Sequence, residues 1–172
     1  MHRDIKSQNF LVSAGSREDG AARSGARFTL KLSDFGETRL YSPGHTEPGA
    51  IGTLQWMAPE VMAGLTGYTP SIDVYSYAMV LWELVTYDHP FRGLRDDAVV
   101  YLVQNGYRPS IPPDCPPDYV ALLQACWSPE PYKRPSAAAL VAALSRMVVA
   151  ERRELRAART ARVAGRAPPG AR

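Results

Sequence analysis

The stretch SIDVYSYAMVLWELVT, residues 71–86, is apolar nearly all round when it is placed on a helical wheel. A surface helix would carry one polar face, so this composition predicts a helix buried at the centre of a domain. Ser71 is placed to cap its first turn. The chain has 172 residues, 45% of them hydrophobic, which is enough for one core of ordinary size around such a helix.

Three more helices are predicted downstream of the central one, over residues 96–105, 118–127 and 136–159. An apolar stripe on the last of them stops near Val148, and the sequence beyond is rich in Arg and Ala. The tail is also strongly basic, because residues 146–172 hold 8 Arg and 2 Glu. We therefore expect a folded region over residues 1–148 and an Arg-rich, frayed or disordered tail over residues 149–172.

Upstream of the central helix the pattern changes to that of short strands. Residues 9–13 are apolar, and residues 28–33 alternate between apolar and polar side chains. The Gly/Ser/Arg-rich segment 14–27 between them predicts an exposed hairpin loop. Residues 34–59 show little periodicity, which indicates a long loop of the functional kind. The predicted fold class is α+β and predominantly helical, with a short β-hairpin.

Three motifs occur in a fixed order around these elements. His2-Arg3-Asp4 with Asn9 fits H-R-D-x-x-x-x-N, Asp34-Phe35-Gly36 follows a strand, and Ala58-Pro59-Glu60 comes next. In this order they resemble the eukaryotic protein kinases. The resemblance covers about residues 2–148 and continues through GTLQWMAPE (52–60), DVYSYA (73–78), RPSIPPDCP (108–116) and CWSPEPYKRP (126–135). It implies the C-terminal lobe of a kinase domain, with the hairpin at the active site.

Two features of the motifs concern the substrate hydroxyl. HRDIKSQN and GTLQWMAPE match the serine/threonine pattern, whereas DVYSYA and CWSPEPYKRP look like tyrosine kinases. This mixture resembles the tyrosine-kinase-like group, which mostly phosphorylates Ser and Thr. The resemblance therefore implies transfer of the γ-phosphate of ATP to Ser and Thr of protein substrates.

The resemblance assigns a role in phosphoryl transfer to five residues. Asp4 would accept the proton of the attacking hydroxyl, and Lys6 would place a positive charge beside the transferring group. Asn9 and Asp34 would supply hard oxygen ligands to Mg²⁺. Thr53 is expected to hydrogen-bond Asp4 and Lys6. Any of these residues alone would be read as an ordinary loop residue, and the functional reading depends on the whole set.

One further residue is predicted to contact the nucleotide. Leu11 follows Asn9 by two positions, where kinases carry the residue that packs under the adenine ring of ATP. A leucine in a strand can equally be an ordinary core residue, and the sequence leaves both readings open.

Other matched positions concern architecture. Glu60 and Arg134 are expected to form a buried ion pair, and Asp73 is expected to hold the backbone of the His2-Arg3 turn. Three aromatic residues are expected in the core rather than at a ligand site: Trp56, Trp82 and Trp127.

The resemblance also suggests regulation by phosphorylation. Arg3, beside Asp4, can pair with a phosphate on the following loop and thereby order it. The candidate acceptors are Thr38, Tyr41, Ser42 and Thr46, of which Ser42 and Thr46 are favoured by position. The alternative is a loop that is merely flexible.

Kinases carry a Gly-rich loop, a strand Lys and a helix Glu before the H-R-D motif, and residues 1–172 contain none of them. We therefore expect a fragment whose missing partner is the N-terminal lobe of a longer chain. Alone it is expected to be marginally stable, to expose an apolar patch and to have very low activity. A non-catalytic binding module is the alternative function.

The remaining observations concern location and other partners. No secretory signal or membrane span is visible, and Cys115 and Cys126 show no pairing framework, so a reduced, cytoplasmic setting is expected. The basic tail could contact nucleic acid or an acidic membrane, but a solvated helix end is the favoured reading. Nucleic acid is not expected as a partner.

Overall fold

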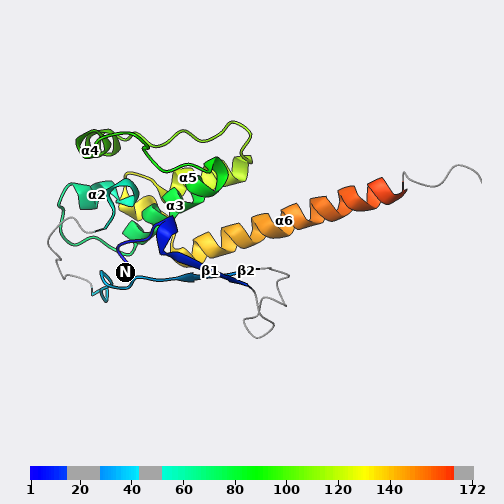
Figure 1. The fold of residues 1–172 in the computed structure, drawn as a ribbon, viewed down its shortest axis with the longest axis horizontal. Helices are drawn as coiled ribbons and strands as arrows, with labels where there is room; N and C mark the ends of the chain where they lie inside the picture. The colour runs from blue at the N-terminus through cyan, green and yellow to red at the C-terminus, as the bar shows by residue number, and fades with distance from the viewer. Residues whose placement is uncertain (15–27, 43–51, 165–172) are drawn as a thin grey trace, which may run out of the picture. The chain divides into compact units, whose positions relative to one another are not determined.

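The structure is a computed structural model that describes residues 1–14, 28–42 and 52–164. The chain divides into two compact units, Met1–Pro135 and Ser136–Arg172. The first unit contains a two-stranded sheet and helices α2 to α5, and the second contains the long helix α6 (Figure 1). The predicted α+β, mainly helical architecture is therefore what the described residues form.

A β-hairpin follows the first nine residues. A 3-10 turn, η1 (Ser7–Asn9), leads into β1 (Phe10–Ala14), which pairs antiparallel with β2 (Phe28–Leu32). The register places Phe10 opposite Leu32, and the Phe10 ring lies 6.1 Å from that of Tyr77. One end of the sheet is therefore attached to helix α3. The segment predicted as the exposed hairpin loop lies outside the described residues.

Helix α3 (Ser71–Thr86) has the predicted bounds and is the buried centre of the first unit. Tyr75, Ala78 and Met79 have no exposed surface. The predicted cap is wrong, because Ser71 is the first helical residue and its hydroxyl lies 2.7 Å from that of Thr69. Pro70 already has a helical backbone conformation, and the side chain that meets the first turn is that of Thr69, whose hydroxyl accepts a hydrogen bond of 3.4 Å from the Ser71 amide.

Short helices surround α3. They are η2 (Leu54–Trp56), α2 (Pro59–Met62), α4 (Asp96–Gln104), α5 (Pro117–Cys126) and η3 (Pro131–Lys133). Helices η2, α5 and η3 pack on α3, and α4 packs on α2 and η2. The bounds of α4 and α5 agree with the predicted ones to within one residue. All three tryptophans lie in the core, as expected: Trp56, Trp82 and Trp127.

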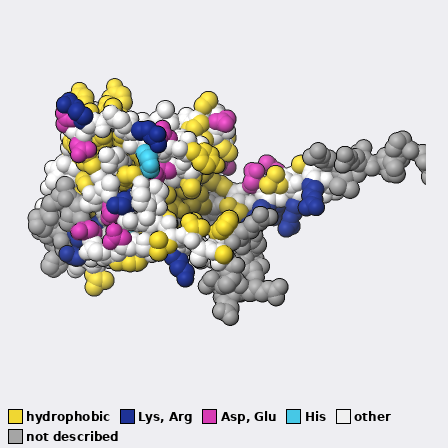
Figure 2. Space-filling view, in the orientation of Figure 1, with side chains coloured by type: hydrophobic (Ala, Val, Ile, Leu, Met, Phe, Trp, Pro, Cys, Tyr) yellow, Lys and Arg dark blue, Asp and Glu magenta, His cyan; other side chains and the backbone are white. Residues whose placement is uncertain are grey.

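Helix α6 (Ala137–Ala164) forms the second unit. The Ser136 hydroxyl accepts a hydrogen bond of 3.2 Å from the Ala139 amide and caps the first turn. The helix was predicted over residues 136–159 and continues to Ala164, because Ala and Arg both favour helices. The predicted domain boundary at residues 148/149 stays a prediction. Charged side chains are visible along it (Figure 2). In the part of the chain that the structure describes, no helix is long and apolar enough to cross a membrane.

Candidate active site

The first residues of the chain are held by the start of helix α3. The Asp73 carboxylate accepts hydrogen bonds from the backbone amides of His2, at 2.7 Å, and Arg3, at 2.8 Å. Arg3 has φ = 72°, a left-handed conformation that is uncommon outside glycine. The expected contact of Asp73 with this turn is present, and it fixes the backbone from which the Asp4 side chain projects.

Asp4, Lys6 and Thr53 form one hydrogen-bonded cluster. The Thr53 amide and hydroxyl both donate to Asp4 Oδ1, at 2.9 and 2.8 Å. Lys6 Nζ lies 2.8 Å from Asp4 Oδ2 and donates to Thr53 Oγ1 at 2.7 Å. The contacts expected of Thr53 are therefore present, although 47 residues separate it from Lys6.

Gly52, the residue before Thr53, explains how the segment that carries Thr53 comes so close to the loop that carries Asp4. Gly52 has φ = 110°, which only glycine adopts readily, and a Cβ at this position would lie 2.5 Å from the carbonyl oxygen of Arg3. Any side chain would therefore push the segment away from the loop that carries Asp4.

The surroundings of Asp4 set its proton affinity. Burial raises the pKa of this carboxyl, but hydrogen bonds from Lys6 and Thr53, the Lys6 charge and a hydrogen bond from Asn9 outweigh burial and lower the pKa below its ordinary value. Asp4 is therefore a carboxylate at neutral pH. It can accept a proton only from a group that has become strongly acidic.

Asn9 lies next to Asp4 and is oriented by it. Both hydrogens of its amide are engaged, because Nδ2 donates to the Asp4 carbonyl oxygen at 2.8 Å and to Asp4 Oδ2 at 3.2 Å. The amide oxygen is thereby directed away from Asp4. Ser33 donates from its amide and hydroxyl to the Asn9 carbonyl oxygen, each at 2.9 Å, which brings neighbouring Asp34 to the same place.

Asp34 directly follows Ser33 and is exposed. Its backbone is left-handed, with φ = 62°. A carboxylate and an amide oxygen are hard ligands of the kind that Mg²⁺ prefers. Asn9 and Asp34 therefore carry the ligand types that a magnesium site needs, and their role as its ligands stays a prediction.

The predicted adenine contact and regulatory residues are less tightly placed. Leu11, in β1, is 59% exposed. The Arg3 side chain is buried, donates from Nε to the Glu37 carbonyl oxygen and lies 3.9 Å from the Glu37 carboxylate. Ser42 is exposed, and Thr46 lies outside the described residues. The roles of all four stay predictions.

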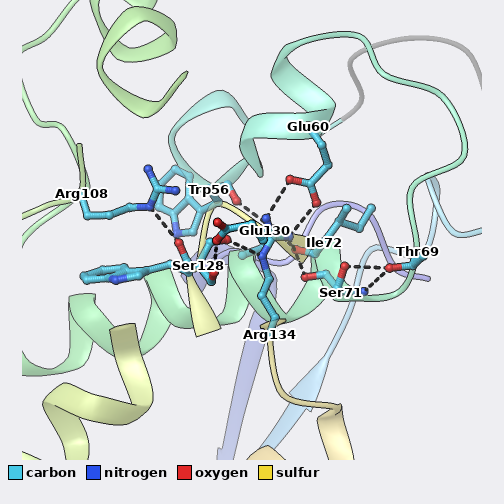
Figure 3. A network of polar contacts seen from close by, with 11 residues as sticks. Trp56, Glu60, Thr69, Ser71, Ile72, Arg108, Ser128, Glu130 and Arg134 are labelled. Carbon is cyan, nitrogen blue, oxygen red and sulfur yellow. Dashed lines mark hydrogen bonds and ion pairs between the residues drawn. The ribbon is translucent and has the colours of Figure 1, made fainter. Parts of the chain in front are cut away.

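The expected ion pair of Glu60 and Arg134 is present and buried (Figure 3). Arg134 donates to both carboxylate oxygens, at 2.6 and 2.8 Å, and also to the carbonyl oxygens of Ser128 and Ser71. These contacts join α2, α3 and the segment around η3. Two-point binding of this kind is the strongest form of an Arg–carboxylate pair.

Sequence reasoning missed the aromatic partner of this ion pair. Tyr75 lies between two guanidinium groups, because the Cζ atoms of Arg108 and Arg134 are each 5.1 Å from its ring centroid. Burial raises the pKa of Tyr75 to about 12 although both cations oppose the shift. No local pattern in the sequence indicates this arrangement.

Glu83 is a second missed residue, although the sequence carries a signal for it. It is a charged residue within the apolar part of helix α3. The structure places its carboxylate against Ser7, Trp56 and His89. A charge on a buried helix needs donors, so this position could have been singled out.

Comparisons with known proteins agree with this geometry. A model of the family described as protein tyrosine and serine/threonine kinase matches residues 1–144. A Dictyostelium discoideum protein named "Probable LIM domain-containing serine/threonine-protein kinase" is 38% identical over 79% of this chain and 19% of its own length. Mitogen-activated protein kinase kinase kinase 10 of Xenopus laevis is 38% identical over 79% of this chain and 13% of its own length.

A plant relative is also similar. Serine/threonine/tyrosine-protein kinase HT1 of Arabidopsis thaliana is 36% identical over 85% of this chain and 34% of its own length. The chain thus spans about a third or less of these relatives. The ordered motifs, the cluster around Asp4 and the family match over residues 1–144 lead to one assignment. The chain belongs to the protein tyrosine and serine/threonine kinase family.

Proposed function

We propose that residues 1–148 are the C-terminal lobe of a protein serine/threonine kinase of the tyrosine-kinase-like group. In this proposal the lobe transfers the γ-phosphate of ATP to Ser and Thr hydroxyls of protein substrates. The observation that carries the proposal is the Asp4 cluster, in which Lys6, Thr53 and Asn9 all donate to one carboxylate. An ordinary surface aspartate has no such set of donors.

Each residue of the site has a separate role in the proposed reaction. Asp4 orients the substrate hydroxyl and takes its proton late, when the new oxygen–phosphorus bond has made that proton acidic, as the lowered pKa of Asp4 requires. Lys6 places its charge beside the transferring group. Mg²⁺, held by Asn9 and Asp34, supplies neutralisation of the phosphate charge when it is bound. Thr53 hydrogen-bonds Asp4 and thereby joins the loop that would bind the protein substrate to the loop that carries Asp4.

The choice of Ser and Thr rests on Lys6. Its ammonium joins Asp4 to Thr53, at 2.8 and 2.7 Å. Tyrosine kinases usually carry Ala or Arg at this position, and neither would reproduce the same two contacts. The name of the Dictyostelium discoideum relative, a probable serine/threonine-protein kinase, supports the same choice.

The hairpin supports the need for an N-terminal lobe. Leu11, Val12, Phe28 and Leu30 are 59% to 64% exposed in the described structure. The pairing of Val12 with Leu30 and of Ala14 with Phe28 places three of these side chains on one face of the sheet and Leu11 on the other. Large exposed apolar side chains on a small sheet are typical of a surface that another part of a protein covers. In the proposal that part is the lobe that holds ATP from the other side.

The test is phosphotransfer by the longest natural chain that contains residues 1–172. Incorporation of phosphate into a mixed peptide substrate, followed by phosphoamino-acid analysis, should give phosphoserine and phosphothreonine. Asp4→Asn should lower the rate by about 10² to 10⁴-fold. Asp114→Asn, in an exposed loop outside the site, is the matched control and should leave the rate unchanged. ATP·Mg²⁺ binding without phosphate transfer would instead favour the non-catalytic binding module.

A further inference from the structure

Glu83 lies on helix α3 and carries a carboxylate with only 9% of its side chain exposed. The nine other residues that line the same helix core are uncharged. A charge in such a place is stable only when donors replace the water that it has lost. The identity of these donors indicates what the residue does.

The two carboxylate oxygens of Glu83 bind different parts of the chain. Oε1 accepts a hydrogen bond of 2.8 Å from the Ser7 hydroxyl and lies 3.3 Å from His89 Nδ1. Oε2 accepts a hydrogen bond of 2.9 Å from the Trp56 indole. The His89 ring also meets the Trp56 ring edge-on, with centroids 6.3 Å apart. Glu83 therefore connects three segments to α3.

Two of these segments are the ones that carry the Asp4 cluster. Ser7 directly follows Lys6, and Trp56 follows Thr53 by three residues in η2. Trp56 is held at a second point, because its carbonyl oxygen accepts a hydrogen bond of 2.8 Å from the Ser76 hydroxyl, also on α3. The two segments are therefore joined twice. Lys6 contacts Thr53 directly, and a few residues away Ser7 and Trp56 both bind Glu83.

We propose that Glu83 is a positioning residue for phosphoryl transfer. It holds Ser7 and Trp56 at a fixed separation and thereby keeps Lys6 and Thr53 on Asp4. The proposal rests on the proposed kinase function for its catalytic meaning, but the mechanical link can be measured without any reaction. The hydrogen bonds of Glu83 in the described structure go to Ser7, Trp56 and His89, and none goes to Asp4 itself.

The link makes a measurable connection between Glu83 and the Asp4 cluster. The Thr53 amide donates to Asp4 Oδ1 at 2.9 Å, and this hydrogen bond protects the amide from exchange with water. When Glu83 no longer holds the segments, the Thr53 amide spends less time on the carboxylate. Its hydrogen exchange should then become faster. A residue that only stabilises the core would not single out this amide.

The experiment uses the full 172-residue chain and two substitutions of similar size. Glu83→Leu removes both acceptors and should speed hydrogen exchange of the Thr53 amide, which is followed by NMR. It should also speed hydrogen exchange of the Trp56 indole by about tenfold. The Trp82 indole, which donates to the Ser110 carbonyl oxygen at 2.8 Å, is the internal reference and should not change.

Glu83→Gln is the conservative variant. Its amide oxygen can accept from Trp56 while its NH₂ group donates to the Ser7 hydroxyl, so both measurements should stay close to those of the unchanged chain. Ser7→Ala breaks the link on one side only and leaves the core intact. It should speed hydrogen exchange of the Thr53 amide even if Glu83→Leu prevents folding.

The outcomes separate the two proposals. Unchanged hydrogen exchange of the Thr53 amide in Ser7→Ala and in folded Glu83→Leu would overturn the positioning role. In the longer chain used for phosphotransfer, Glu83→Leu should lower kcat by about 10 to 100-fold with little change in KM for ATP. Amide exchange that does not respond to Glu83, in a chain that transfers phosphate, would refute only the positioning role. Amide exchange that responds to Glu83, in a chain that transfers no phosphate, would refute only the kinase function.

Discussion

The loop of residues 1–9 and the hairpin that directly follows it differ sharply in how they are supported. In the loop, Asp73 binds the backbone at His2 and Arg3, and Asn9 is buried against Asp4. In the hairpin, Leu11 and its apolar neighbours are largely exposed. The loop that carries Asp4 is therefore held by contacts within the described residues, whereas much of the hairpin's apolar surface has no such cover.

The largest effect is expected at the buried Glu60–Arg134 pair, in which Arg134 also binds the first residue of α3, the helix that carries Asp73. Arg134→Met leaves the buried Glu60 carboxylate without its cation, which should lower the free energy of unfolding by about 3–5 kcal/mol. Lys133→Met is the control, because Lys133 pairs with Glu130 on the surface and its side chain is 56% exposed. Chemical denaturation of both variants measures the difference. Equal losses would mean that burial of the pair is unimportant.

A smaller effect is expected for Asp73, and it should be confined to the loop of residues 1–9 and leave the hairpin unchanged. Asp73→Asn keeps the shape but leaves one acceptor oxygen for two amides, so about 1.5–3 kcal/mol should be lost. Amide hydrogen exchange should become faster at His2 and Arg3 while the pairing of Phe10 with Leu32 is unchanged. Faster exchange throughout the hairpin would show that the two regions depend on one anchor.

The acid stability of the chain should depend on Asp4. Its pKa is lower in the folded state than the ordinary value of 3.8, so its contribution to stability is fully present above that value. The contribution is lost as the pH falls through the lower, folded pKa. Unfolding measured between pH 2 and 6 should therefore show a shallower acid limb for Asp4→Asn. Identical pH profiles would mean that the donors do not favour the charged form.

The smallest effect on stability is expected in the hairpin. Val12 and Leu30 lie directly opposite each other on the two strands and are mostly exposed. Changing both to Thr, which suits a strand, should alter the free energy of unfolding by no more than about 0.5 kcal/mol. Binding of a dye that reports apolar surface should nevertheless decrease. A large loss of stability would show that the hairpin is supported by contacts like those of the loop.

Much of the fold could be predicted because its signals are local. The bounds of α3, α4 and α5 followed from runs of apolar residues within single helices. The short helix α2 was not predicted, since four residues are too few to show a period. The cap at Ser71 failed because the preceding turn, rather than the residue type, decided where the helix begins.

The candidate site was predicted from its motifs, and the contacts of Thr53, Asp73 and Glu60 agree with that prediction. What the motifs did not contain is the link through Glu83, because Ser7 and Trp56 are 76 and 27 residues away from it. Nor did they indicate that Arg3 lies beside Glu37. Such contacts depend on how separate segments pack, which no local pattern records.

The sequence by itself determined the family, the buried central helix and the residues suited to phosphoryl transfer. Each of these depends on particular residue types at short, fixed spacings along the chain. The tertiary structure alone decided which donors meet on the Asp4 carboxylate and how helix α3 holds them there. The physical reason is that hydrogen bonds to a partly buried carboxylate reach across tens of residues and form only once the core has brought those segments together.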